Sequence, residues 1–149
     1  VHHGNGTQDV FYADPSVFYF SVHQFPHYPG SGAAGETGTG AGEGYTLNVP
    51  LSPGAGDGEY LCVFRDKLVP ALDAFRPEFV FISAGFDAHR RDPLASMDLT
   101  DEGYGRLTAL VAGIAREHAS GRLVSVLEGG YDLDALAASV AAHVQALTR

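Results

Sequence analysis

The stretch FVFISAGFD, residues 79–87, decides the fold. Its first five residues, Phe79–Ser83, are almost all apolar, which is typical of a strand that is buried on both faces of a sheet. Gly85, Phe86 and Asp87 follow at the carboxyl end of this strand. We therefore expect a parallel sheet in the protein interior, with polar residues gathered where its strands end.

Strand-like and helix-like patterns alternate along the rest of the chain. Further strands are predicted at 17–22, at 45–49 (closed by Pro50) and at 123–127. One helix begins near Asp57, which can cap it, and Pro70 should kink or interrupt that helix. A second helix begins at the capping sequence Thr100-Asp101-Glu102-Gly103. The apolar positions of the last helix are Leu133, Leu136, Val140, Val144 and Leu147. This order predicts the α/β class, a parallel sheet with helices on both faces.

Composition excludes several classes of protein. The 149 residues are 45% hydrophobic, so the chain can bury a core and is not disordered. No apolar run approaches the roughly 20 residues of a spanning helix, and no signal peptide is visible. The net charge of −9 argues against direct nucleic-acid binding. The lone Cys62 fits a reducing compartment. We expect a cytoplasmic protein that contacts neither membrane nor nucleic acid.

Polar side chains collect at the predicted carboxyl ends of the strands, where parallel sheets bind ligands. They are His23 and Gln24, then Asp87, then the run from Glu128 to Tyr131. His2 and His3 join them if Val1 ends a strand. Histidine and carboxylate together are typical zinc ligands. Each residue also has an ordinary alternative: Asp87 could close a turn, Tyr131 could pack in the core, and the two histidines could lie on the surface.

Glycine is concentrated at residues 30–44. The stretch has the glycine density of a phosphate-binding loop, but it precedes a strand and lacks the Lys-Ser/Thr ending. A loop that is flexible or that shapes a ligand site is the better interpretation.

Four motifs resemble the histone deacetylase-like zinc amidohydrolases, and they occur in that family's order. They are HHGNGTQ at 2–8, HQFPHYPGSG at 23–32, SAGFDAH at 83–89 with Asp92-Pro93-Leu94, and EGGY at 128–131. The resemblance covers nearly the whole chain and points to the class II and acetylpolyamine amidohydrolase-like branch, with bacterial members.

The resemblance implies a zinc-dependent deacetylase that hydrolyses the acetamide of acetyl-lysine in proteins or of acetylated polyamines. It implies that His2 and Asp87 bind Zn²⁺ and that Tyr131 donates a hydrogen bond to the oxyanion. The implied substrate-binding residues are Tyr28, Leu94, Gly129 and Gly130. K⁺ is a further possible cofactor of the family. The matching positions are Ser21 and Val22, together with the carbonyl of His2, and a second set of Phe11, Asp14, Val17 and Tyr45.

The other histidines and the cysteine are expected to have structural roles or, in two cases, to lie where they could contact substrate. We expect His23 to be structural, His27 and His89 to lie in loops where they could contact substrate, His118 and His143 to face solvent on helices, and Cys62 to lie in the core.

In the family, a further zinc-binding aspartate and the general-base histidines precede the position of His2. The resemblance therefore predicts that residues 1–149 are the C-terminal portion of a single catalytic domain, able to form a homo-oligomer. The alternative is a catalytically incomplete remnant that binds a ligand or a partner chain.

Overall fold

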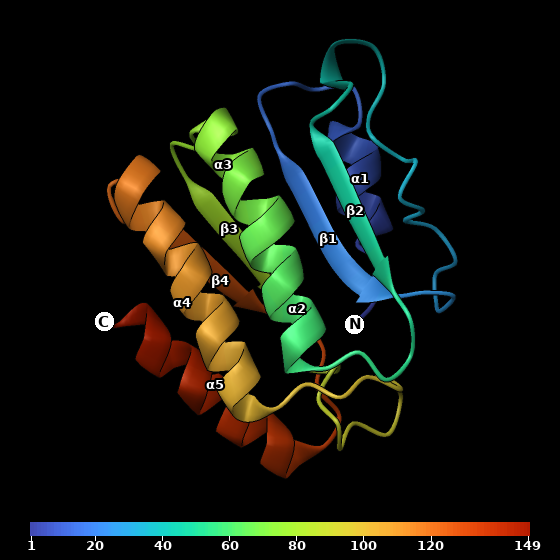
Figure 1. Ribbon diagram of the computed structural model, residues 1–149, viewed down its shortest axis with the longest axis vertical. Coiled ribbons are helices and arrows are strands. Elements are labelled where there is room, and N and C mark those ends of the chain that lie inside the picture. The colour runs from blue at the N-terminus through green and yellow to red at the C-terminus, as the bar shows by residue number, and fades with distance from the viewer. The chain divides into compact units, whose positions relative to one another are not determined.

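The computed structural model describes residues 1–149, which form two compact units (Figure 1). The N-terminal unit comprises His2–Pro53. The C-terminal unit comprises Gly54–Arg149 together with Val1. No helix in either unit is both long enough and apolar enough to cross a membrane.

A parallel strand pair forms the centre of the N-terminal unit. Helix α1 (Asn5–Phe11) precedes strand β1 (Tyr19–Gln24), and a short 3-10 turn, η1 (Gly40–Gly42), precedes strand β2 (Thr46–Leu51). The pairing runs in register from Tyr19 opposite Thr46 to Gln24 opposite Leu51. Both strands were predicted, but β2 continues past the proline that was expected to close it. Pro50 lies opposite His23 within the pair, because a strand with an unpaired side tolerates a residue without an N–H.

The C-terminal unit begins with one long helical run in three segments. Helix α2 (Asp57–Val63) continues through a π-helical turn, η2 (Phe64–Leu68), into α3 (Val69–Phe75). The predicted interruption is confirmed: Pro70 occupies the first turn of α3, and the π turn lies directly upstream. The predicted capping role of Asp57 is wrong. Its carboxylate instead accepts hydrogen bonds from Thr100 N–H (2.9 Å) and Oγ1 (2.7 Å).

The strand that decides the fold pairs in parallel with the last strand. Strand β3 (Val80–Ala84) runs beside β4 (Leu123–Leu127), with Val80 opposite Leu123. Helix α4 (Asp101–His118) connects these two strands along the chain. Its predicted start is confirmed, because Thr100 Oγ1 accepts a hydrogen bond from Gly103 N–H at 3.0 Å. One sheet face packs on α4 and forms a core. Its members are Val80, Ile82, Leu123, Val111, Ala115 and Ala119.

The opposite face of β3 and β4 is open, which corrects the prediction of a strand buried on both sides. Phe81 is 74% exposed and Val126 is 52% exposed. Phe81 and Val124 are register partners and therefore share this face. The run of apolar residues was read correctly as a strand, but helices cover only one of its faces within this unit.

Helix α5 (Leu133–Leu147) packs against α4 through small and polar residues (Figure 1). Its buried residues are Ala135, Ser139, His143 and Ala146. Leu133 and Val144, which were predicted to face the core, are 77% and 49% exposed. The helix is rotated relative to the prediction because small side chains permit close approach: a Cβ on Gly105 of α4 would lie only 3.4 Å from the Ala142 side chain.

Three further predictions about single residues are corrected. His143 is buried rather than solvent-facing, and hydroxyls of Thr108 and Ser125 contact its two ring nitrogens at 2.7 and 2.8 Å. His118 is mostly covered, with its Nε2 2.8 Å from Asp73 Oδ1. Cys62 is exposed on α2 rather than buried in the core.

Candidate functional site

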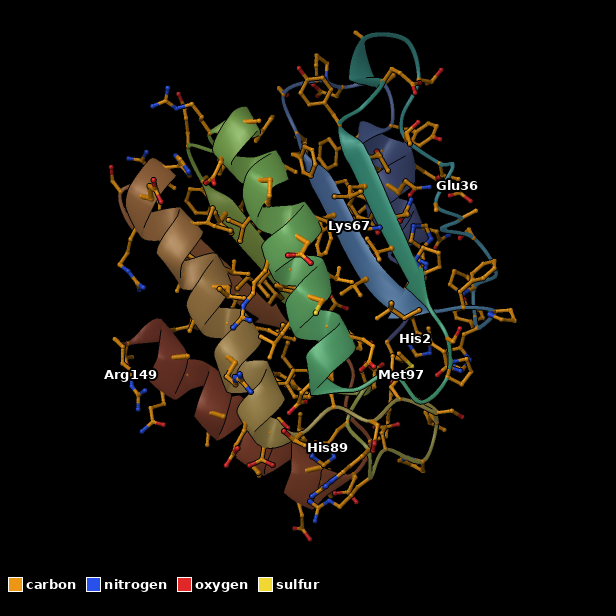
Figure 2. All side chains as sticks on the ribbon, in the orientation of Figure 1. His2, Glu36, Lys67, His89, Met97 and Arg149 are labelled. Atoms are coloured by element: carbon orange, nitrogen blue, oxygen red, sulfur yellow. The ribbon has the colours of Figure 1, made fainter.

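The N-terminal unit gathers aromatic rings around His2. The imidazole of His2 stacks on that of His27, with ring centroids 5.1 Å apart and planes 11° apart. Tyr28 meets the same ring edge-on at 5.9 Å and is itself 77% exposed. His2 lies near the carboxyl end of β1 (Figure 2), the edge at which the sequence predicted ligand binding. The structure thus brings His2 and Tyr28 together.

A buried polar network fixes the neighbouring His3. Glu36 accepts from Gln8 Nε2 at 2.6 Å, so the Gln8 amide oxygen must point toward His3 Nε2, 2.9 Å away. His3 Nε2 therefore carries the proton, and its Nδ1 faces Ser31 Oγ at 2.8 Å. Asn48 donates to the same Gln8 oxygen at 2.6 Å. This network ties the glycine-rich loop to α1 and β2, and sequence reasoning missed it because no periodicity marks Glu36.

His23 is structural, as predicted. Its side chain is 1% exposed, its Nε2 donates to the Gly32 carbonyl at 3.0 Å, and its Nδ1 accepts from Ser21 Oγ at 3.0 Å. Burial, with a smaller contribution from His3, lowers the pKa of His23 to about 4. Gly32 has φ +91°, and a Cβ there would lie 2.5 Å from His23 Nε2. Only glycine fits between the two histidines.

Acidification should destabilise the fold through His23. The pKa of an unfolded histidine is 6.5 and that of folded His23 is about 4, so the unfolded state binds more protons between these values. The stabilising contribution is complete above pH 6.5, falls as the pH drops through this window, and totals about 3 kcal/mol. We expect His23→Gln, which keeps a donor and an acceptor but does not titrate, to flatten the pH dependence of the unfolding free energy between pH 6.5 and 4. Equal slopes for the two proteins would contradict this assignment.

The residues proposed for K⁺ all belong to the N-terminal unit. Ser21 and Val22 lie in β1. In the second set, Phe11 is the last residue of α1, Asp14 and Val17 lie between α1 and β1, and Tyr45 directly precedes β2. The Phe11 carbonyl accepts from Asp14 N–H at 3.0 Å, and the Tyr45 carbonyl accepts from Tyr19 N–H at 2.8 Å. Each carbonyl keeps a second lone pair. The K⁺ sites stay predictions.

In the C-terminal unit, Asp87 is a buried carboxylate at the end of β3. It is 2% exposed, and a carboxylate so buried requires nearby positive charge or hydrogen bonds. The chain beyond β4 approaches closely: the Gly129 carbonyl accepts from Phe86 N–H at 2.8 Å, and a Cβ on Gly129 would collide with Asp87 Oδ2. Gly129 therefore permits the close backbone approach that was predicted.

The loop that follows β3 is joined to the loop that follows β4 by Asp92. This buried carboxylate accepts from Leu94 N–H through Oδ1 at 2.9 Å and from Tyr131 N–H through Oδ2 at 2.8 Å. The side chains of Leu94 and Tyr131 are 55% and 51% exposed. Sequence reasoning quoted Asp92 within a motif but gave it no role. Its position two residues before Leu94, typical of a carboxylate that closes a turn, was the available signal.

His89 holds this loop rather than facing a substrate. Its side chain is 4% exposed, and its Nδ1 accepts from Arg91 N–H at 3.1 Å. His89 lies in the loop beside the first residues of α4 (Figure 2), with its Nε2 4.0 Å from Asp101 Oδ1. Burial, aided by the Arg91 charge, lowers the pKa of His89. The prediction that His89 contacts substrate is therefore not supported by its position.

A second group of side chains could hold a metal ion. Asp73, Glu117 and His118 offer ligand atoms within 4.8 Å of one another on α3 and α4. The two carboxylates are exposed, and the hydrogen bond between His118 and Asp73 already accounts for their proximity. This group is the structural alternative to a metal site at the strand ends.

Comparison with known proteins places these features in context. A family model of the histone deacetylase domain matches residues 1–147. A probable deacetylase of Archaeoglobus fulgidus is 49% identical over 134 residues, covering 90% of this chain and 37% of that protein. A histone deacetylase-like amidohydrolase of Pseudomonas aeruginosa is 46% identical over 134 residues, covering 88% of this chain and 35% of that protein.

Solved structures agree with the sequence relatives. The crystal structure of the HDA15 HD domain superposes with a TM-score of 0.93 at 46% identity, covering 99% of this chain and 41% of that one. The predicted α/β deacetylase fold is thereby confirmed. The chain spans about a third of the length of the curated relatives it matches.

Proposed function

Because this chain belongs to the histone deacetylase family, we propose that it forms the C-terminal portion of a zinc-dependent catalytic domain. The reaction proposed for the whole protein is hydrolysis of the acetamide bond of acetyl-lysine in proteins or of acetylated polyamines. Two facts support a partial domain: the chain spans about a third of its relatives, and one face of β3 and β4 leaves Phe81 and Val126 exposed. We expect the rest of the domain to cover that apolar face.

The observation that carries the proposal is the setting of Asp87. A carboxylate that is only 2% exposed just beyond the carboxyl end of β3, with the Gly129 backbone in close contact, is strongly stabilised by a nearby cation. An imidazole and a carboxylate are a suitable donor set for Zn²⁺. We therefore propose His2 and Asp87 as zinc ligands. A family of this kind implies a metal ion, and we propose that this ion is zinc.

When bound, zinc polarises the amide carbonyl and lowers the pKa of a water molecule. The remaining tasks belong to side chains of this chain. Tyr131 donates its hydroxyl hydrogen bond to the oxyanion that develops on the carbonyl oxygen. Tyr28 and Leu94, both exposed, contact the methylenes of the acylated chain, and the backbone at Gly129 and Gly130 approaches the reacting atoms closely. K⁺ bound by the residues given above would be a further structural ion.

The test is an activity assay of the complete protein. We expect it to release acetate from an acetyl-lysine peptide or from acetylated polyamines, to lose activity with a chelator, and to regain it with Zn²⁺. Comparing the two substrates decides the substrate class. A zinc-replete, folded protein that releases acetate from neither would overturn the proposal in favour of a non-catalytic binding domain.

A further inference from the structure

We propose that Asp92 is a positioning residue that sets the placement of Tyr131, an inference that rests on the proposed function. Its carboxylate joins two loops that are far apart in the sequence, with one oxygen for each loop. Oδ1 accepts from Leu94 N–H at 2.9 Å, and Oδ2 accepts from Tyr131 N–H at 2.8 Å. One side chain therefore fixes the backbone of a proposed substrate-contacting residue and of the proposed oxyanion donor.

The burial of Asp92 makes this link strong. The residue is 7% exposed, and a charged acceptor shielded from water forms hydrogen bonds roughly twice as strong as neutral ones. Both of these partners are backbone N–H groups, so the contact constrains the path of the chain rather than the rotamer of another side chain. The position of the Tyr131 Cα is consequently coupled to Asp92.

A second contact, a partly exposed ion pair, also joins these two loops. Arg91 Nη2 lies 3.2 Å from Asp132 Oδ1, and Asp132 also caps α5 by accepting from Ala135 N–H at 2.7 Å. The side chains of this ion pair are 49% and 32% exposed, so it contributes little stability by itself. The backbone at Tyr131 is thus held by two contacts: the buried hydrogen bond from its own N–H to Asp92, and the more exposed ion pair of the next residue, Asp132, with Arg91.

The backbone before Tyr131 depends on external contacts to hold its path. Gly130 has φ +145°, a conformation that side chains rarely adopt, and a Cβ there would lie 2.8 Å from Leu136 Cδ1. Because a glycine pair precedes Tyr131, the local sequence restricts the loop weakly. The hydrogen bond from Tyr131 N–H to Asp92 restricts the backbone conformation of the loop, which the two glycines alone do not.

The proposal predicts a specific kinetic effect in the complete zinc-loaded enzyme. We expect Asp92→Ala to lower kcat by about 10- to 100-fold, since a misplacement of about 1 Å can cost 10²-fold, while KM changes less than about threefold. Asp92→Asn keeps only one acceptor oxygen and should lose less. Asp134→Asn removes an exposed carboxylate from the first turn of α5 and serves as the matched control, with kcat unchanged.

A double-mutant cycle separates positioning from general damage. If Asp92 acts through Tyr131, Asp92→Ala added to Tyr131→Phe should lower kcat by less than about twofold further. Hydrogen exchange provides a readout independent of activity: the Tyr131 amide should exchange faster in Asp92→Ala, while zinc content stays at the wild-type level. Multiplicative losses in the cycle, or an unchanged exchange rate, would overturn the proposal.

Two controls cover the remaining outcomes. If Asp92→Ala does not fold, the same cycle and exchange measurement on Asp92→Asn decide the matter. If Tyr131→Phe alone leaves kcat unchanged, the proposed role of Tyr131 fails instead. In that case the positioning proposal, which depends on that role, is rejected with it, even if the exchange measurement confirms the hydrogen bond.

Discussion

We expect the Tyr131→Phe variant of the complete enzyme to lose about 10²- to 10³-fold in kcat, the range observed when one donor to a developing oxyanion is removed. The loss should appear in kcat more than in KM, because the bond from the hydroxyl strengthens as charge develops on the carbonyl oxygen. Zinc content and thermal stability should stay at wild-type values. The Tyr131 side chain is 51% exposed, and its position is fixed through its backbone N–H, which phenylalanine retains.

A matched variant tests whether the effect is local. Tyr12→Phe removes a phenol hydroxyl from the N-terminal unit, where Tyr12 has no proposed role, and should leave kcat unchanged. Steady-state kinetics with an acetyl-lysine peptide at saturating Zn²⁺ measures both variants. If Tyr131→Phe keeps more than half of the wild-type kcat, another donor stabilises the oxyanion and the role given to Tyr131 is wrong.

The strands could be predicted because their signal is local. The run at 79–83 and the run at 123–127 are continuous and rich in β-branched or aromatic residues, and the structure has strands at Val80–Ala84 and Leu123–Leu127. Polar residues at the strand ends follow from parallel topology, which made Asp87 a candidate before any geometry was known. Whether helices cover one face or both faces of this sheet could not be predicted, since a continuous apolar run is compatible with either arrangement.

The orientation of α5 could not be predicted, because its tightest contacts involve its least hydrophobic side. Leu133 and Val144 are among the large apolar residues that define the periodic pattern of this helix, yet both are exposed, whereas Ser139 and His143 are buried. Small and polar side chains allow close helix packing, and the hydroxyls of Thr108 and Ser125 satisfy the His143 ring. Burial lowers the pKa of His143.

The residues that organise the candidate site were missed for a different reason. Asp92 and Glu36 accept hydrogen bonds from groups distant in the sequence, Tyr131 N–H and the Gln8 amide, and the local sequence around either residue does not identify these partners. Two opposing effects act on the pKa of the Glu36 carboxyl. Burial raises this pKa, but the hydrogen bonds from Gln8 and from backbone N–H groups outweigh burial and lower it overall. Motif resemblance supplied the proposed reacting groups, whereas the contacts that support them required the structure.

Replacing Asp87 with asparagine should remove zinc from the enzyme. The substitution keeps the size and shape of the side chain, so the close approach of Gly129 is preserved, but a neutral amide oxygen replaces an anionic ligand. We expect zinc affinity to fall by more than the roughly 10- to 100-fold that loss of an outer-shell partner costs. Activity should fall with zinc occupancy and recover in part at high zinc concentration, which distinguishes weakened binding from unfolding.

The exposed group on α3 and α4 provides the decisive comparison. Asp73→Asn removes one carboxylate from the Asp73, Glu117 and His118 group and leaves Asp87 intact. Zinc content per chain, measured by mass spectrometry after gel filtration, should fall in Asp87→Asn and stay at the wild-type level in Asp73→Asn. The reverse result would place the metal on the surface of the helices and leave the buried carboxylate at the end of β3 without its proposed role. Asp87 is 2% exposed whereas Asp73 is exposed, and burial is the physical reason to expect the metal at Asp87, because a buried carboxylate gains more from a bound cation than an exposed one does.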